Sequence, residues 1–209
     1  MGHVVLLGDS IFDNARYVPD RPPVIEQLRR SLPTGWQATL LAVDGHVTED
    51  VATQLRELPS DASHLFVSCG GNDALGASSI LQEAVATVGD ALCLLHEIGT
   101  RFRDEYRQML QAVSAATKPV AVCTIYDAIP HLGRAEQTAL ALFNDVILRE
   151  AFLVGIPVID LRLLCNRDAD YSPLSPIEPS VVGGSKIAGT IAEVTARHDF
   201  SAKRTIVYW

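Results

Sequence analysis

The chain has 209 residues, of which 48% are hydrophobic, so it can bury one sizeable core and we expect a single domain over residues 1–209. Its 25 acidic and 17 basic residues give a net charge of −8 without any Lys/Arg tract, which argues against nucleic acid as a partner. The first apolar run, residues 3–7, is too short for a membrane span and lacks the features of a signal peptide, so we expect a cytoplasmic protein.

Short apolar runs rich in β-branched residues alternate along the chain with stretches of helical spacing. Helical patterns fill the intervals between these runs, and two separate patterns, 81–95 and 102–113, follow the third run. The alternation predicts an α/β fold in which a parallel sheet is covered by helices on both faces. The five predicted strands are 3–8, 37–43, 64–69, 119–124 and 156–161.

Polar residues follow the predicted strands at the points where these strands end. Because the carboxyl ends of parallel strands meet at one edge of a sheet, we expect these side chains to surround one site. The segments are Asp9-Ser10, Asp44-Gly45-His46, Gly70-Gly71-Asn72-Asp73, Tyr126-Asp127 with His131, and the loop that carries Asp168, Asp170 and Glu178.

This set of residues matches what acyl transfer requires. A serine nucleophile must lose its proton to a base, and the carbonyl oxygen that becomes negative must meet prepositioned hydrogen-bond donors. Ser10 is the candidate nucleophile, and the candidate donors are the N–H groups of Ser10 and Gly45 and the side-chain amide of Asn72. The pattern therefore predicts acyl transfer through an acyl-enzyme on Ser10. The substrate is expected to be small because short loops leave little material for a long acyl channel.

Four segments of the chain resemble the four sequence blocks of the SGNH (GDSL) hydrolases. They are Gly8-Asp9-Ser10, Gly45, Gly70-Gly71-Asn72-Asp73 and Glu178-Pro179-Ser180, in this order over nearly the whole chain. The resemblance implies a flavodoxin-like, three-layer α/β/α fold with five parallel strands. It also implies metal-independent esterase or acyl-ester hydrolase activity, with Ser10 as nucleophile and Gly45 and Asn72 as oxyanion donors. With this resemblance we predict a hydrolase that cleaves a small ester or acyl group through an acyl-enzyme on Ser10.

The fourth block departs from the family pattern at the position of the general base. The family has Asp-x-x-His there, in which the histidine is the base and the aspartate orients it. The aligned residues of this chain are Ser175-Pro176-Ile177-Glu178, so both positions are altered.

Three interpretations of this departure stay open. In the first, Glu178 is the base, and its pKa is raised by burial or by a neighbouring carboxylate, Asp168 or Asp170. In the second, a histidine from elsewhere, His131 or His46, takes the proton. In the third, the pocket binds a ligand without catalysing a reaction.

A different class of protein fits part of the pattern. Doubly wound domains with acidic residues after the first and third strands can hold Mg²⁺ for phosphoryl transfer, and Asp9, Asp13 and Asp73 have suitable oxygen atoms. This alternative leaves Ser10 and Asn72 without roles. The four cysteines show no metal-ligand spacing either, so we expect neither a metal nor a cofactor.

The last five residues, Thr205-Ile-Val-Tyr-Trp209, form an apolar segment that would be unusual in water. We expect it either to pack back on the sheet or to pair with a second copy of the chain. In the second case the protein is a homo-oligomer.

Overall fold

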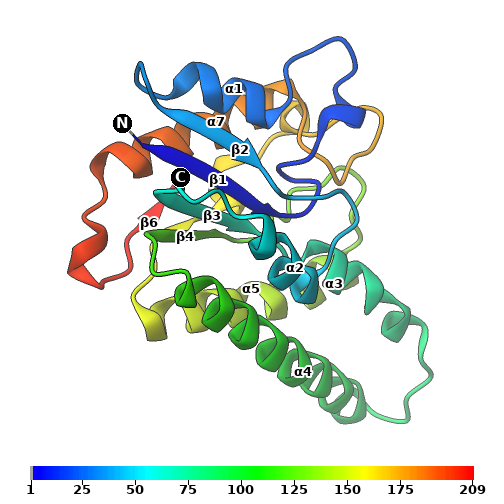
Figure 1. The fold of residues 1–209 in the computed structure, drawn as a ribbon. Coiled ribbons are helices and arrows are strands. Elements are labelled where there is room, and N and C mark those ends of the chain that lie inside the picture. Colours follow the sequence, from blue (N-terminus) through cyan, green and yellow to red (C-terminus); the bar gives the residue numbers. More distant parts are fainter. Residues whose placement is uncertain (1) are drawn as a thin grey trace.

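The computed structural model of the chain describes residues 2–209 and has one parallel β-sheet at its centre (Figure 1). The strands lie in the order β2-β1-β3-β4-β5-β6, and every neighbouring pair is parallel. The order of the first five strands is that of flavodoxin-like doubly wound sheets. The strands are β1 (His3–Gly8), β2 (Gln37–Leu40), β3 (His64–Ser68), β4 (Val120–Cys123), β5 (Val158–Ile159) and β6 (Val207–Tyr208).

The sixth strand corrects the predicted count of five. It comes from the apolar C-terminal segment, which packs back on the sheet beside β5, with Val158 opposite Val207 and Ile159 opposite Tyr208. The Asp160 N–H group extends the pairing by donating a hydrogen bond of 2.8 Å to the Tyr208 oxygen. A pairing of two residues is too short to leave an alternating pattern in the sequence, which is why the strand was not predicted.

Helices cover both faces of the sheet, which confirms the predicted α/β class (Figure 1). Helices α1 (Val24–Ser31) and α7 (Val181–Arg197) pack together on one face, and α4 (Val88–Ala115) and α5 (Arg134–Val154) pack together on the other. The short α-helices are α2 (Val51–Gln54), α3 (Gly71–Gly76) and α6 (Leu161–Leu164). Short 3₁₀ helices span Ala15–Tyr17, Thr48–Asp50, Leu55–Glu57, Ser78–Gln82, Asp168–Asp170 and Phe200–Ala202.

Strand side chains alternate between two buried cores, one on each face of the sheet. In β1, Val5 and Leu7 join the core under α4 and α5, whereas Val4 and Leu6 join the core under α1 and α7. All four side chains are fully buried, as expected for a continuous apolar strand in a parallel sheet. The loops at the carboxyl edge therefore start from a sheet that is packed on both sides.

One long helix, α4, replaces the two helical patterns that the sequence predicts after the third strand. It spans 28 residues, and its N-terminal part extends beyond the sheet, where Val88 is 77% exposed (Figure 1). A capping box starts it, because Thr87 Oγ1 accepts from the Asp90 N–H and Asp90 accepts from the Thr87 N–H. Gly99 lets α4 approach α5 closely, since a Cβ atom there would lie 2.9 Å from Leu142.

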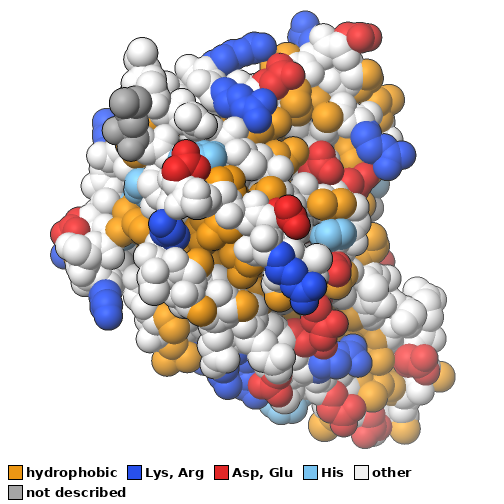
Figure 2. All heavy atoms as spheres, viewed as in Figure 1, with side chains coloured by type: hydrophobic (Ala, Val, Ile, Leu, Met, Phe, Trp, Pro, Cys, Tyr) orange, Lys and Arg blue, Asp and Glu red, His pale blue; other side chains and the backbone are white. Residues whose placement is uncertain are grey.

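The surface carries both signs of charge. On the face seen in Figure 2, Lys and Arg side chains are interspersed with Asp and Glu and do not gather into one basic patch. This face therefore offers no cluster that could follow a phosphate backbone. Within residues 2–209, none of the helices combines the length and the apolar character needed to cross a membrane.

Candidate active site

Ser10 lies two residues after the end of β1, in a turn that requires glycine at position 8. Gly8 has a φ of +119°, and a Cβ atom there would lie 1.8 Å from the backbone oxygen of Ser68 in β3. The Asp9 N–H donates to that same oxygen at 3.0 Å, and the Asp9 oxygen accepts from the Asp13 N–H at 3.1 Å. These bonds fix the turn at the carboxyl edge of the sheet, with Ser10 6% exposed.

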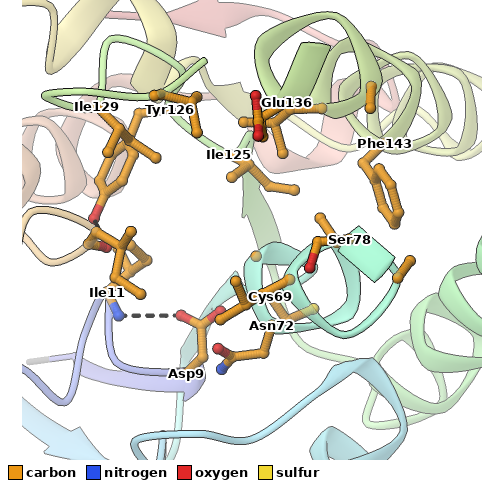
Figure 3. A pocket seen from close by; sticks show the side chains of 18 of the residues that line it. Asp9, Ile11, Cys69, Asn72, Ser78, Ile125, Tyr126, Ile129, Glu136 and Phe143 are labelled. Carbon is orange, nitrogen blue, oxygen red and sulfur yellow. Dashed lines mark hydrogen bonds between the residues drawn. The ribbon is translucent and has the colours of Figure 1, made fainter. Parts of the chain in front are cut away.

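Asn72, in the first turn of α3, lines the same cavity as Ser10. The close-up view shows its side chain beside that of Asp9 (Figure 3). Its Nδ2 atom donates one hydrogen to the backbone oxygen of His46 at 2.8 Å, which leaves the second amide hydrogen available. The structure thus brings together two of the three residues predicted to bind an oxyanion.

Gly45 lies in the loop that Asn72 contacts, next to His46. It is exposed, has a φ of +86°, and a Cβ atom at this position would meet nothing within 4 Å. Within residues 2–209, its N–H donates no hydrogen bond. Gly45 does not line the cavity that Ser10 and Asn72 share. It lies next to this cavity, in the loop whose His46 oxygen accepts from Asn72.

Glu178 lines the cavity from the loop before α7 and is 4% exposed. Side chains from distant segments hold the residues on either side of it. The Tyr126 hydroxyl donates to the Ile177 oxygen at 2.7 Å, and the Asn14 amide donates to the Pro179 oxygen at 3.0 Å. The backbone that carries the Glu178 carboxyl group is therefore fixed relative to the sheet edge.

The surroundings of Glu178 raise its pKa from 4.5 to about 7, mainly because burial disfavours the carboxylate. The nearby Ser10 hydroxyl acts in the opposite direction and lowers the pKa, whereas the negative charges of Asp44 and Asp13 add to the rise. Oε2 of Glu178 is buried and has no hydrogen-bond partner within residues 2–209. A carboxyl group with this pKa and an unused oxygen beside a serine hydroxyl can accept the proton of that hydroxyl.

The acidic neighbours of Glu178 differ from those considered in the sequence analysis. Asp168 is exposed, and Asp170 is buried in an ion pair with Lys186, whose Nζ lies 2.7 Å from Asp170 Oδ2. The charges that act on Glu178 come instead from the loops after β1 and β2. No local pattern connects these loops with the segment before α7, so the neighbours could be found only in the fold.

Asp9 also faces the cavity and is 3% exposed. Burial raises its pKa from 3.8 to about 8, and the negative charges of Glu178 and Asp73 add to this effect. The Ile11 N–H, which donates to Asp9 Oδ1 at 3.1 Å, lowers the pKa and does not offset the burial (Figure 3). Asp9 therefore holds a proton at neutral pH, whereas Glu178 is about half ionised.

The structure brings neither candidate histidine into the cavity. His131 is exposed, adopts a left-handed backbone with a φ of +67°, and makes no side-chain hydrogen bond within the described residues 2–209. His46 lies outside the cavity wall, and its Nδ1 atom is 3.0 Å from Nε2 of Gln54. Among the three candidate bases, Glu178 is the one that shares the cavity with Ser10.

The carboxylates considered for Mg²⁺ do not gather into one cluster. Over the described part of the chain, no group of three or more His, Cys, Asp or Glu side chains is arranged to hold a metal ion. Asp13 Oδ2 accepts from the Asp44 N–H at 3.0 Å, and both oxygens of Asp73 accept from the Thr48 N–H. These carboxylates brace loops at the sheet edge.

The cavity has a volume of about 150 Å³ and a largely apolar wall. It extends from the β1 turn to side chains of α4 and α5, and Figure 3 shows Phe143 on the side away from Asp9. For scale, an apolar cavity of about 150 Å³ in another protein binds benzene. The apolar residues include Leu75, Leu81, Leu95, Ile98, Leu140 and Phe143.

Comparison with known proteins gives a family match and several structural matches. The sequence model of the GDSL-like lipase/acylhydrolase family matches residues 6–183. No curated protein sequence matches the chain.

Three solved structures illustrate the structural similarity. An extracellular lipase from Streptomyces rimosus has a TM-score of 0.67 at 19% identity, over 94% of this chain and 99% of that chain. A member of the lipolytic protein G-D-S-L family from Veillonella parvula has a TM-score of 0.70 at 18% identity, over 95% and 100%. The esterase EstA from Pseudoalteromonas sp., in a structure inhibited by monoethylphosphonate, has a TM-score of 0.62 at 12% identity, over 94% and 100%. At these identities the similarity establishes a shared fold.

Proposed function

Since the chain belongs to the GDSL-like lipase/acylhydrolase family and is an ester hydrolase of that family, we propose that Ser10 is its nucleophile and Glu178 its general base. The family match confirms the family that the sequence blocks resemble. The proposed substrate is an ester with an apolar acyl group of moderate length. The proposed oxyanion donors are the N–H groups of Ser10 and Gly45 and one amide hydrogen of Asn72.

The proposed reaction has two halves. In the first, Glu178 takes the proton of the Ser10 hydroxyl as Oγ bonds to the carbonyl carbon, and the carbonyl electron pair moves onto oxygen. The N–H donors stabilise this oxyanion, each by about 3 kcal/mol in well-studied enzymes. The C–O bond to the alcohol then breaks, and the alcohol leaves with the proton that Glu178 held.

The second half releases the acid and restores the enzyme. Glu178 takes a proton from water as the water oxygen bonds to the carbonyl carbon of the acyl-enzyme. The bond from the carbonyl carbon to Ser10 Oγ breaks, and the serine regains its proton from Glu178. A single carboxyl group thus carries the proton in both directions, and burial rather than an orienting aspartate supplies its basicity.

The state of the Glu178 carboxyl group is the single observation that carries this proposal. It lies in the same cavity as Ser10, has one buried oxygen without a hydrogen-bond partner among the described residues 2–209, and has a pKa of about 7. A buried carboxyl oxygen without a partner is costly to the fold, so its retention beside a nucleophile is better explained by chemistry than by packing.

The shape of the cavity supports an acyl group of roughly six carbon atoms, by analogy with the benzene-sized cavity above. The sequence analysis expected a small substrate because short loops offer no acyl channel. In the structure the helical segments after β3 and helix α5 supply much of the cavity wall, so the pocket does not depend on loops alone.

Covalent labelling tests the proposal most simply. A nitrophenyl phosphonate ester should transfer its phosphonyl group to Ser10, and mass spectrometry of the peptide that contains Ser10 should show the adduct. The Ser10→Ala variant should be unlabelled and should not hydrolyse nitrophenyl hexanoate. If the parent protein binds the ester without turnover and without labelling, the pocket only binds ligands and the proposal fails.

A further inference from the structure

The side chain of Gln54 is almost fully buried, at 5% exposure, at the end of the short helix α2. Its Oε1 atom accepts the Gly8 N–H at 2.7 Å, and its Nε2 atom donates to the Gly8 oxygen at 2.7 Å. Both backbone groups of Gly8 are thereby held by one carboxamide. Gly8 is the residue whose left-handed backbone starts the turn to Ser10.

The second hydrogen on Gln54 Nε2 is directed to a different loop. Nδ1 of His46 lies 3.0 Å from Gln54 Nε2. Because the Gly8 N–H group identifies Oε1 as the acceptor end of the carboxamide, Nε2 must donate to His46. Nδ1 of His46 is then unprotonated, and its Nε2 carries the proton of the neutral ring.

His46 is held from its backbone as well. Its oxygen accepts from the side-chain amide of Asn72 at 2.8 Å. The preceding residue, Gly45, is exposed, and nothing lies within 4 Å of the place where its Cβ would be. The loop between β2 and α2 is therefore held by hydrogen bonds to the residues around Gly45, and no packing against Gly45 itself holds it.

We infer that Gln54 is a positioning residue that sets the distance between the Ser10 turn and the Gly45 loop. This inference rests on the proposed function, in which Ser10 attacks and the Gly45 N–H and Asn72 amide receive the oxyanion. Among the residues of the described chain, Gln54 has the one side chain that hydrogen-bonds both Gly8 and His46. Oxyanion donors act only when they are fixed within a few tenths of an ångström, so a loose loop lowers the rate of the chemical step.

Other bonds hold the ends of the same loop. The Asp44 N–H donates to Asp13 at 3.0 Å, and the Thr48 N–H donates to Asp73 at 3.1 Å. These contacts do not involve the carboxamide of Gln54, so they should keep the loop folded when the His46 contact is removed. The role of Gln54 can therefore be measured without unfolding the site.

Two substitutions at His46 test the inference. In His46→Asn, the side-chain oxygen can take the place of Nδ1 and accept the Gln54 hydrogen, whereas His46→Ala leaves that hydrogen without a partner. With nitrophenyl hexanoate as substrate, we expect His46→Ala to lower kcat by about 10-fold with KM changed less than about twofold, as for a group that acts in the transition state. His46→Asn should stay within about threefold of the parent.

The alternatives give different results. Equal loss in both variants would show that the imidazole itself takes part, and parent-like rates in both would show that the contact positions nothing; either result overturns the inference. Gln54→Met, which removes both contacts, should lower kcat at least as much as His46→Ala, provided that thermal unfolding shows a folded protein. Phosphonate labelling of Ser10 should remain detectable in all three variants. Its absence in the parent would instead contradict the proposed function.

Discussion

The hydroxyl of Ser10 and the carboxyl group of Glu178 line one cavity, one after the first strand and the other before α7. The hydroxyl favours the charged form of the carboxyl group, and burial opposes it. The outcome is a carboxyl group with a pKa of about 7, where an ordinary glutamate would be fully ionised. This relationship makes several consequences measurable.

The buried acids Glu178 and Asp9 should make the protein less stable as the pH rises. Their pKa values in the fold are raised from 4.5 to about 7 and from 3.8 to about 8. Between these pKa values the folded protein binds more protons than the unfolded chain. The contribution of the two acids to the free energy of unfolding is therefore highest below about pH 4 and is lost as the pH rises through 7 and 8. Denaturant unfolding at about pH 5 and pH 8 should show this fall in the free energy of unfolding.

Amide variants isolate the contribution of each acid. Glu178→Gln and Asp9→Asn remove the titration, so each should be more stable than the parent at pH 8 by about 1 kcal/mol or more, with a smaller gain at pH 5. Glu193→Gln is the matched control, because Glu193 is exposed on α7 and should leave the pH dependence unchanged. Parallel pH curves for the parent and both buried variants would contradict the assigned pKa values.

Narrowing the apolar cavity should select against longer acyl groups. Ala139, on α5, lines the cavity, and Ala139→Phe fills space that an acyl chain would use. We expect kcat/KM for nitrophenyl hexanoate to fall by about 10-fold or more, with nitrophenyl acetate little affected. Ala139→Ser keeps the volume and is the control. Equal loss for both esters in a folded Ala139→Phe protein would place the acyl group elsewhere.

Much of the fold could be predicted because its strands are buried on both faces. The first and third strands appear at 3–8 and 64–68, as their apolar runs predict. The second strand ends earlier than predicted, because the N–H groups of Leu41 and Ala42 both donate to the Leu6 backbone oxygen and leave the ladder there. The fifth strand, predicted over 156–161, is limited to 158–159, and helix α6 begins at Leu161. The capping box at Thr87 sets the start of α4, and the helix continues through Gly99, so the two helical patterns join in one helix.

Gly8→Ala should disrupt the protein by a purely steric route. A methyl group at this position would overlap the Ser68 oxygen, and the φ of +119° is strained for any residue with a Cβ atom. We expect a loss of more than about 3 kcal/mol in the free energy of unfolding, or no folded protein. Gly189→Ala is the control, because Gly189 is exposed on α7 with open space where a Cβ atom would lie. The higher helix propensity of alanine should raise the free energy of unfolding of this variant by about 0.5–1 kcal/mol.

The C-terminal strand should contribute to stability. Deleting the residues after Ala202 removes β6, its pairing with β5, and the hydrogen bond from Asp160 to Tyr208. We expect a lower Tm and an unchanged apparent size in size-exclusion chromatography, because the segment pairs within its own chain. An unchanged Tm would show that β6 adds nothing, and elution as a smaller species would show that the segment joins two copies.

The candidate site could be predicted in part. Ser10, Asn72 and Glu178 follow strand ends or a sequence block, and the structure places all three on one cavity. The source of the Glu178 pKa could not be predicted, since it depends on burial and on loops distant in sequence. The positioning role of Gln54 could not be predicted from the sequence, because Gln54 ends a helix of four residues, which is too short to show a helical pattern. His131 carries an imidazole that could act as a base, but it is exposed and does not line the cavity.

The pH dependence of kcat/KM for nitrophenyl hexanoate, in the parent and in Glu178→Gln, is the most direct test of Glu178 as the base. The parent rate should rise with pH and level off with an apparent pKa of about 7, because the carboxylate form is the active one. Glu178→Gln should lose about 100-fold or more at the plateau, while Glu193→Gln and His131→Ala stay near the parent. A Glu178→Gln rate within about threefold of the parent, with the same pH dependence, would contradict the assignment.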